Sequence, residues 1–593
     1  MVNTLALVLA GVLLYTVVAM VLRARGSLPP SVRIQGPITT IHTQRGRAFL
    51  DWLARPKRFW RAWGNFGVGI ALVVMVGSFV AVLAAAYGTI QSPQQTAITQ
   101  PQNVLVIPGV NDFLPLSAAP EIVFGLLVGL VVHEGGHGLL CRVGDIEIDS
   151  MGLALVALVP VGAFVEPDED SRQRADRGNQ TRMFAAGVTN NFAVALVAFL
   201  LLFGPVVGAI QPVAGAAVGD VARGSAAAAG GIQRGDVITG VNGTAVTGPD
   251  DLDAALREAP GRTLHVSLAD GREVTVQRRL LLTRAVESQV PGIDLSGGPP
   301  VVSAVNGTPV HTQGEFLAQL GDRSRAQVQT ESSGNATIVA GALVAVAPDE
   351  PLAAAGATPG TSMVITQLDG DRVVTDDDLT AALSDTDPGQ TVTVVAYRDG
   401  ERRTYQVELG TNQAAPDRGL LGVRVQAGVS GITVDDFGAD VYPADQYLAL
   451  LGGGDGPFGL GAGNFFQRVF LVLFLPFASA VDPTFTYNFA GFVGPVTNFY
   501  EPTGPLAVLG GGVFTLANVL FWTGWVNLQL GFFNCIPAFP LDGGHILRTS
   551  TEAVVSRLPI RAGRSVTSVV TTAISLVMLA GVLLMVFGAQ LLG

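Results

Sequence analysis

The sequence is poor in charged residues and in cysteine. Asp, Glu, Lys and Arg together make up 14% of its 593 residues, compared with about 25% in average soluble proteins. With a mean hydropathy of +0.45, this low charge content indicates a membrane protein. The only two cysteines, Cys141 and Cys535, exclude a disulfide framework. The formal net charge of −12 argues against nucleic acid as a direct partner, because binding phosphates requires clustered Lys and Arg.

Long apolar runs predict the membrane helices. A spanning helix needs about 20 mostly apolar residues. Six runs reach or approach that length, at residues 5–22, 66–87, 122–141, 184–210, 506–533 and 566–592. A further run at 463–481 is broken by proline and polar residues, so we expect it to be re-entrant or interfacial. The predicted fold class is a polytopic α-helical membrane protein with about six transmembrane helices and an inserted α/β region.

Arginine clusters predict the orientation of these helices. Basic residues gather at 45–61, 172–182 and 548–564, and such clusters favour the cytosolic side. The first run has Arg23 and Arg25 after it and no basic residue before it. This charge order is the reverse of a cleaved signal peptide, so we expect a retained helix. The prediction is a multi-pass protein of the cell membrane, with its long polar insert at about 211–450 on the extracytoplasmic side.

The insert contains an internal repeat. VITGVNGTAV (237–246), VVSAVNGTPV (301–310) and VITQLDGDRV (364–373) align with one another. Each copy predicts a strand, a two-residue Asn-Gly or Asp-Gly turn and a second strand. A short helical pattern follows each copy at a matched offset. A period of about 64 residues is too long for a solenoid unit and favours a small α/β module.

The segments before the first and third copies, SAAAAGGIQRGD and PLAAAGATPGTS, resemble those of circularly permuted PDZ domains. The middle copy lacks this segment, which indicates a degenerate module. RGLLGVRV (418–425) resembles the Gly-hydrophobic-Gly loop with which PDZ domains hold a peptide terminus. An ordinary β-turn between packed strands is the alternative interpretation.

The stretch VVHEGGHGLL (131–140) places polar groups inside an apolar run. On a helix, His133 and His137 share one face, as two ligands of a zinc ion require. Glu134 would lie beside the metal, where it can accept a proton from water. This is the His-Glu-x-x-His pattern of zinc peptidases. The alternative is that the two histidines merely pack in the core. That interpretation must explain why an acidic residue lies at membrane depth, because burying a charge in the bilayer is energetically unfavourable and such residues usually mark functional sites.

A catalytic zinc site needs a third protein ligand. GFFNCIPAFPLDGGHIL (531–547) offers Asp542 after two prolines and before two glycines, at the end of an apolar run. The prolines break the helix and the glycines permit an unusual turn, so this carboxylate could project inward. In the alternative interpretation, Asp542 caps the helix that starts at Gly543.

HEGGH in one apolar segment, NCIPAFPLDGG (534–544) in another, and PDZ-like modules between them resemble the site-2 protease family of intramembrane metalloproteases. The resemblance implies that His133, His137 and Asp542 bind Zn²⁺ and that Glu134 is the catalytic acid/base. The Lys-poor, Asp-rich composition further resembles that of proteins from salt-loving archaea.

Two shorter matches extend the resemblance. Residues 151–165 resemble the family's membrane-edge β-hairpin, which is thought to pair with unwound substrate. AAGVTNNF (185–192) resembles its Gly-Pro-x-x-Asn stretch, with Val188 in place of the proline. This match predicts that Asn191 is catalytic, as a donor to the oxyanion; an interhelical hydrogen bond is the alternative role.

These patterns predict a domain order. We expect additional N-terminal helices and a cytosolic loop at 1–121, a catalytic membrane half at 122–210, PDZ-like modules at 211–282, 283–345 and 346–430, and a second membrane half at 431–593.

The predicted partners are the lipid bilayer and membrane-tethered proteins, whose transmembrane segments would be cleaved to release a regulator. The PDZ-like modules would filter or bind these substrates. Two other functions stay open: a catalytically inactive membrane scaffold with PDZ domains, and a zinc transporter or sensor. The oligomeric state does not follow from the sequence.

Overall fold

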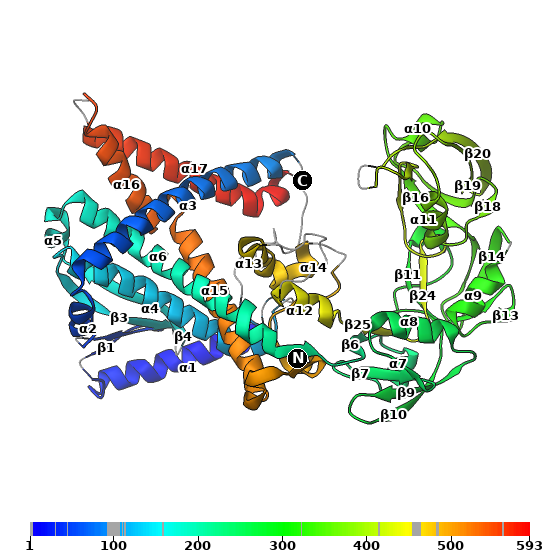
Figure 1. Ribbon diagram of the computed structural model, residues 1–593, viewed down its shortest axis with the longest axis horizontal. Helices are drawn as coiled ribbons and strands as arrows, with labels where there is room; N and C mark the ends of the chain where they lie inside the picture. Colours follow the sequence, from blue (N-terminus) through cyan, green and yellow to red (C-terminus); the bar gives the residue numbers. More distant parts are fainter. Residues whose placement is uncertain are drawn as a thin grey trace. The chain divides into compact units, whose positions relative to one another are not determined.

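The computed structural model describes the chain except for residues 1–3, 30, 44, 92–106, 110, 112–113, 157–158, 322, 413–414, 453–463, 482–484, 560–562 and 593. The chain divides into two compact units. Unit 1 consists of Met1–Pro212 and Ala444–Gly593, and unit 2 consists of Val213–Pro443. Unit 1 contains the long helices, and unit 2 is rich in β-strands (Figure 1).

Within the described residues of unit 1, four helical segments are long and apolar enough to cross a membrane: Lys57–Gln91, Leu116–Val143, Arg177–Ala209 and Gly563–Leu591. They contain α3 (Lys57–Gln91), α4 (Ala119–Val143), α6 (Arg177–Leu201) and α17 (Gly563–Leu592). Helix α1 (Thr4–Ala24) and helix α15 (Gly512–Asn534) occupy two further predicted runs but are not among these four segments. The count of about six spans therefore stays a prediction.

Helix α15 lies inside the helical unit. It packs against both α4 and α6, and its Asn518 and Asn527 are buried. Gly125 and Gly129 of α4 permit this packing, since a Cβ at either would lie within 2.8 Å of the Trp522 carbonyl oxygen or 2.6 Å of a Leu530 methyl group. Helices α3 and α17 pack together on another side of the unit (Figure 1).

The run at 463–481 forms no long helix. Gly463 lies outside the described residues, and the remainder forms α13 (Phe465–Phe474), a 3₁₀ turn (Leu475–Phe477) and α14 (Ala478–Val481). Pro476 lies in the turn between the two helices, because it cannot donate the hydrogen bond that would continue α13. The segment is one of the shorter apolar helices rather than one of the four candidate spans.

The hairpin predicted at 151–165 is present as β3 (Ile148–Val156) and β4 (Val159–Pro167), paired antiparallel. Two strands absent from the prediction, β1 (Val32–Gln35) and β2 (Ile38–His42), extend it into a sheet of order β1-β2-β3-β4. They lie in the segment expected to be a cytosolic loop. The added hairpin covers the outer edge of β3, so among the described strands β4 is left as an edge.

The three repeats of unit 2 have the predicted strand–turn–strand structure. They form β7–β8 (Val237–Val241, Thr244–Ala245), β12–β13 (Val302–Val305, Thr308–Pro309) and β17–β18 (Ser362–Leu368, Asp371–Arg372). Asn242, Asn306 and Asp369 have φ of 51°, 52° and 50°, and each is followed by a glycine that also has positive φ. Such a pair suits a tight hairpin turn. Helices α8 (Pro249–Glu258), α9 (Gln313–Leu320) and α11 (Asp376–Ser384) follow the turns, as predicted.

The first and third repeats belong to matching sheets. Their strand orders are β10-β9-β7-β6-β25 and β20-β19-β17-β16-β23, and we call the two folded bodies module 1 and module 3. The strands not yet given are β6 (Ala216–Val221), β9 (Thr263–Leu268), β10 (Glu273–Gln277), β16 (Ala342–Val346), β19 (Thr391–Arg398), β20 (Glu401–Glu408), β23 (Val423–Val425) and β25 (Ala439–Val441).

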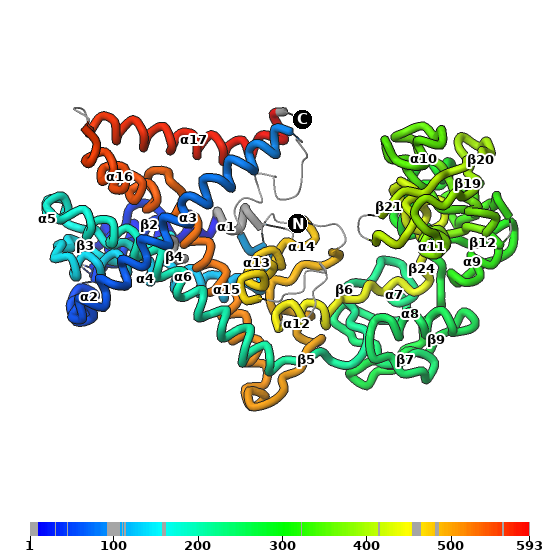
Figure 2. Tube along the Cα trace, turned by 45° about the horizontal axis from the view of Figure 1, so that its top comes forward, coloured from blue at the N-terminus to red at the C-terminus, as the bar shows by residue number. Residues whose placement is uncertain are grey.

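The middle repeat has a smaller sheet, β13-β12-β14-β15, which includes β14 (Arg325–Thr330) and β15 (Asn335–Val339). A two-stranded ladder of β11 (Leu281–Ala285) and β24 (Ile432–Asp435) adjoins it. The last strand of module 1, β25, comes from the chain that follows module 3. The middle repeat and module 3 are therefore inserted between two strands of module 1, and the tube in Figure 2 can be followed through this return.

Candidate metal centre

Helix α4 carries both histidines of HEGGH on one face. Their Nε2 atoms lie 3.2 Å apart, and the two rings meet edge to face. His133 is buried, with 8% of its surface exposed. Gly136, between them, lets α6 approach, because a Cβ there would lie 2.9 Å from the Ala186 carbonyl oxygen. The local sequence thus brings two imidazoles against a neighbouring helix.

Asp542 is the first residue of α16 (Asp542–Val555), after the turn that ends α15. The helix has Leu541 as its N-cap and no side-chain cap, so the Asp542 carboxylate is not used for capping. Gly543 and Gly544 are needed for close packing rather than for positive φ. A Cβ on Gly543 would overlap the carbonyl oxygens of Cys535 and Ile536.

The three candidate ligands converge. Asp542 Oδ2 lies 3.2 Å from His133 Nε2 and 3.2 Å from His137 Nε2, which gives a triangle with equal edges. A tetrahedral zinc ion with bonds of about 2.0–2.1 Å separates its ligands by about 3.3–3.4 Å. Asp542 Oδ2 is buried and receives no hydrogen bond within the described part of the chain. The donor set therefore fits zinc.

Hydrogen bonds behind the imidazoles orient them. His137 Nδ1 lies 2.7 Å from the Met183 carbonyl oxygen, to which it donates, so its Nε2 presents a lone pair to the centre. Asn191 is fully buried on α6, and its Nδ2 lies 3.4 Å from His133 Nδ1. Its Oδ1 has no partner among the described residues. Rotation of the amide by 180° would let the His133 Nδ1–H donate to Asn191 Oδ1 and would leave His133 Nε2 free to bind a metal ion.

The structure thus places Asn191 behind a candidate ligand, in the interhelical hydrogen bond that was its alternative role. Its predicted contact with an oxyanion stays a prediction. Cys141 is fully buried in an apolar cluster. Among the described residues, the group of side chains that could hold a metal ion consists of His133, His137 and Asp542.

Glu134 faces the β-sheet. Its Oε2 accepts a hydrogen bond of 3.0 Å from the Val165 backbone N–H. Val165 pairs with Met151 of β3, and its N–H is directed away from that partner to Glu134. The free edge of β4 and the candidate acid/base are therefore in direct contact.

Gly187 of α6 is a functional position that the sequence interpretation missed. A Cβ there would lie 2.7 Å from His137 Nε2 and 2.8 Å from His133 Nδ1. Only a glycine leaves room for both imidazoles at this crossing. The residue stands inside the AAGVTNNF match, but no local pattern distinguishes it from a glycine that serves helix packing alone.

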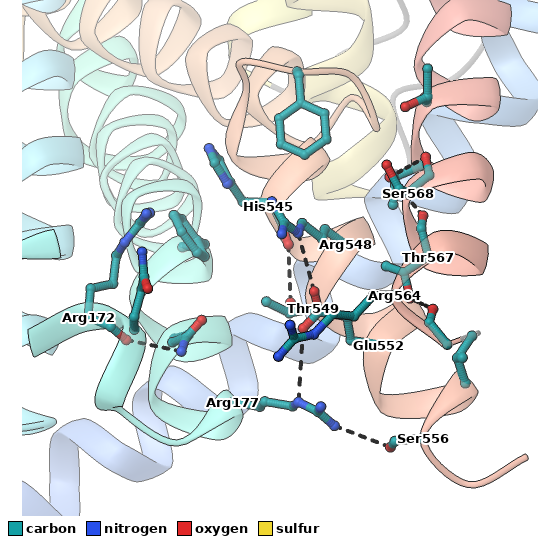
Figure 3. A pocket seen from close by; sticks show the side chains of 18 of the residues that line it. Arg172, Arg177, His545, Arg548, Thr549, Glu552, Ser556, Arg564, Thr567 and Ser568 are labelled. Carbon is teal, nitrogen blue, oxygen red and sulfur yellow. Dashed lines mark hydrogen bonds and ion pairs between the residues drawn. The ribbon is translucent and has the colours of Figure 1, made fainter. Parts of the chain in front are cut away.

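A polar cavity of about 990 Å³ lies beside α16. Figure 3 shows His545, Arg548 and Glu552 from this helix along one wall. His545 stacks on Phe184 with ring centres 4.4 Å apart and is not part of the three-ligand group. Arg172, Arg177 and Arg564 also line the cavity. The cavity places charged side chains next to the helix that carries Asp542.

Comparisons with known proteins point to a family of metallopeptidases. The sequence pattern described as peptidase family M50 matches residues 121–578. Zinc metalloprotease RasP of Oceanobacillus iheyensis is 26% identical over 210 residues, covering 35% of this chain and 42% of RasP. Putative zinc metalloprotease mll0638 of Mesorhizobium japonicum is 30% identical over 216 residues, covering 36% of this chain and 52% of the relative.

Other matches are shorter. Putative zinc metalloprotease Rip3 of Mycobacterium tuberculosis is 44% identical over 62 residues, covering 10% of this chain and 16% of Rip3. The chain thus spans about half the length, or less, of these curated relatives. Among solved structures, the HtrA-type protease AlgW with decapeptide matches 26% of this chain at 15% identity with a TM-score of 0.10.

Proposed function

Because the chain belongs to peptidase family M50, the site-2 proteases, we propose that it is an intramembrane zinc metalloprotease that cleaves transmembrane segments of membrane-tethered proteins. The observation that carries this proposal is the convergence of His133, His137 and Asp542 on one point. Glu134 directly follows His133 on the same helix. His133, His137 and Asp542 would hold the zinc ion.

Zinc, when bound, polarises the scissile carbonyl and makes a nearby water more acidic. The residues of the chain would do the rest. Glu134 takes the proton of the attacking water and passes it to the leaving nitrogen. The bond between His137 and Met183 keeps the imidazole in one tautomer, and Asn191 positions His133 from behind.

Substrate binding would use the free edge of β4. The carbonyls of a membrane helix are already hydrogen-bonded, so a helical turn must unwind before its peptide bond can react. An unwound segment can pair with an edge strand. A segment paired with β4 would compete for the Val165 N–H and thereby release Glu134 for proton transfer. Water would reach the site through the polar cavity beside α16.

Unit 2 would select substrates from the extracytoplasmic side, either by admitting only those already trimmed or by holding a peptide terminus on a PDZ-like module. In this proposal cleavage releases a membrane-tethered regulator. Deletion of residues 213–443 should then abolish the preference for trimmed over intact substrate. An unchanged preference would contradict the filter.

The decisive experiment compares wild type with Glu134→Gln. The variant should keep its zinc but lose cleavage by about 10²–10⁴-fold, as expected when a general base is removed. Membrane proteomics should find released fragments with the wild type only. Glu121→Gln is the matched control, since Glu121 lies on the same helix about 20 Å away. Unchanged cleavage in Glu134→Gln would contradict the proposal and favour an inactive scaffold or a transporter.

A further inference from the structure

Module 1 has a loop that matches the predicted terminus-binding loop of module 3. In module 3, Gly422 is followed by strand β23, which pairs with β16. In module 1, Gly438 is followed by strand β25, which pairs with β6. The first partners are Val423↔Val346 and Ala439↔Val221. We call residues 419–422 loop 3 and residues 435–438 loop 1.

The hydrogen bonds of the two loops correspond one to one. The carbonyl oxygen of Leu421 accepts from Leu352 N at 3.1 Å, and that of Phe437 accepts from Ala227 N at 2.8 Å. The carbonyl oxygen of Gly422 accepts from Ala347 N at 3.1 Å, and that of Gly438 from Ala222 N at 2.9 Å. The two loops therefore have the same backbone path.

The glycines of the loops agree as well. Gly422 has φ of 76° and Gly438 has φ of 81°, a region that favours glycine. A Cβ on Gly422 would overlap Glu350, and a Cβ on Gly438 would overlap Ser225. Glu350 and Ser225 are the N-caps of the short helices α10 (Pro351–Ala354) and α7 (Ala226–Gly230). Both positions therefore require glycine, because the backbone has positive φ and because a Cβ would overlap the N-cap residue of the neighbouring helix.

The loops differ in what their amides bind. In loop 1, Phe437 N and Gly438 N both donate to one oxygen of Asp435, at 2.8 and 2.9 Å. Two amides that converge on one carboxylate oxygen form an anion site. In loop 3 the residue at the position of Asp435 is Gly419, and within the described part of the chain the amides of Leu421 and Gly422 have no acceptor.

The charges beside the loops differ in the same direction. On the strand that follows loop 1, Asp440 pairs across the sheet with Asp220. At the matched positions beside loop 3 stand Arg424 and Ala345. A carboxylate approaching loop 1 meets Asp220 and Asp440, two negative charges. One approaching loop 3 meets the positive charge of Arg424 and one negative charge, that of Glu350, whose Oε2 would lie 3.2 Å from a Cβ on Gly422. Burial raises the pKa of the Asp435 carboxyl above its usual range, in agreement with a group taken out of water to fill loop 1.

We propose that Asp435 occupies the peptide-terminus site of module 1 as an internal carboxylate, so that only module 3 presents an open site for the free C-terminal carboxylate of a peptide. The inference rests on the proposed peptide binding by unit 2 and is independent of proteolysis. When a substrate has been trimmed outside the membrane, loop 3 alone would bind its new C-terminal carboxylate.

The test uses the full-length protein in detergent and a six-residue peptide that ends in valine with a free carboxylate, together with its C-terminally amidated twin. Hydrogen exchange followed by mass spectrometry reports on residues 419–425 and 435–441 separately. In the wild type, the acid peptide should protect 419–425 alone, and the amidated twin should protect neither segment. In Asp435→Ala, loop 1 should exchange at least about tenfold faster without peptide. The acid peptide should now protect both segments, 435–441 at higher peptide concentration than 419–425 because Asp220 and Asp440 remain beside loop 1.

Asp435→Asn serves as the matched variant because its side-chain oxygen can still accept both amide bonds. It should behave as the wild type does, with one protected segment. Protection of 435–441 in the wild type would overturn the inference, as would a failure of Asp435→Ala to gain it. Protein that cleaves nothing but shows this exchange pattern would overturn the proposed protease and leave the inference standing.

Discussion

The tight crossing of α4 and α6 at the metal centre makes Gly187→Ala a sharp test of the site geometry. A Cβ at this position would lie 2.7 Å from His137 Nε2 and 2.8 Å from both Cε1 and Nδ1 of His133. Ordinary contacts of a Cβ begin at 3.4 Å, so the imidazoles must move by about 0.6–0.7 Å. Metal sites tolerate about 0.2 Å. We therefore expect zinc affinity to fall by about 10–100-fold, the loss found when the orientation of a ligand is disturbed.

The assay is zinc content per protein after purification, followed by competition with a chelator of known affinity. Gly135→Ala is the control, since it lies in the same motif and a Cβ there has nothing within 4 Å. Gly135→Ala should retain zinc as the wild type does. If Gly187→Ala bound zinc with wild-type affinity, the imidazoles would not occupy the positions described, and the assignment of the ligand triangle would fail.

Three further predictions concern other parts of the chain. Gly543→Ala should also lower zinc content, because its Cβ overlaps the backbone of the turn that positions Asp542; the same chelator assay measures this. Arg278→Met should destabilise unit 2 by about 3–5 kcal/mol, since it leaves Asp436 as an uncompensated charge that is 5% exposed. Arg272→Met removes an exposed charge that pairs with Asp270 and Asp236 and should leave the stability close to that of the wild type. Urea unfolding followed by limited proteolysis compares the two variants. Asp440→Asn should stabilise unit 2 by a few tenths of a kcal/mol at pH 7, because burial and Asp220 raise the pKa of Asp440. A raised carboxyl pKa means that stability is greatest below the usual value of 3.8 and is lost as the pH rises, so the gain should disappear near pH 3 in the same unfolding assay.

The parts of the fold that could be predicted are those encoded over a few residues. The spacing of His133 and His137 places them on one helical face wherever the helix lies, and an Asn-Gly pair makes its turn without help from the rest of the chain. Asp542 was found by a different route. A catalytic zinc needs a third ligand, and the prolines and glycines around Asp542 marked a break in an apolar run. The close packing of Gly543 against the turn was not predictable, because a glycine without positive φ has no signature in the sequence.

Contacts between distant segments account for what the sequence left open. Strand β25 completes a sheet whose other strands end at Gln277, and no periodicity relates Phe437–Gly438 to that sheet until the pairing with β6 is known. Once it is known, the match to Leu421–Gly422 follows residue by residue. The metal centre also depends on contacts between distant segments. The Met183 carbonyl orients His137 and the missing Cβ of Gly187 leaves room for both imidazoles only because α6 crosses α4 at this point. Residues that bind through their side chains can be recognised by type, whereas residues that act through a backbone atom or a missing Cβ can be recognised only by position. A repeat that is interrupted by inserted modules must therefore be compared after its strands are paired, since its chain order conceals the correspondence.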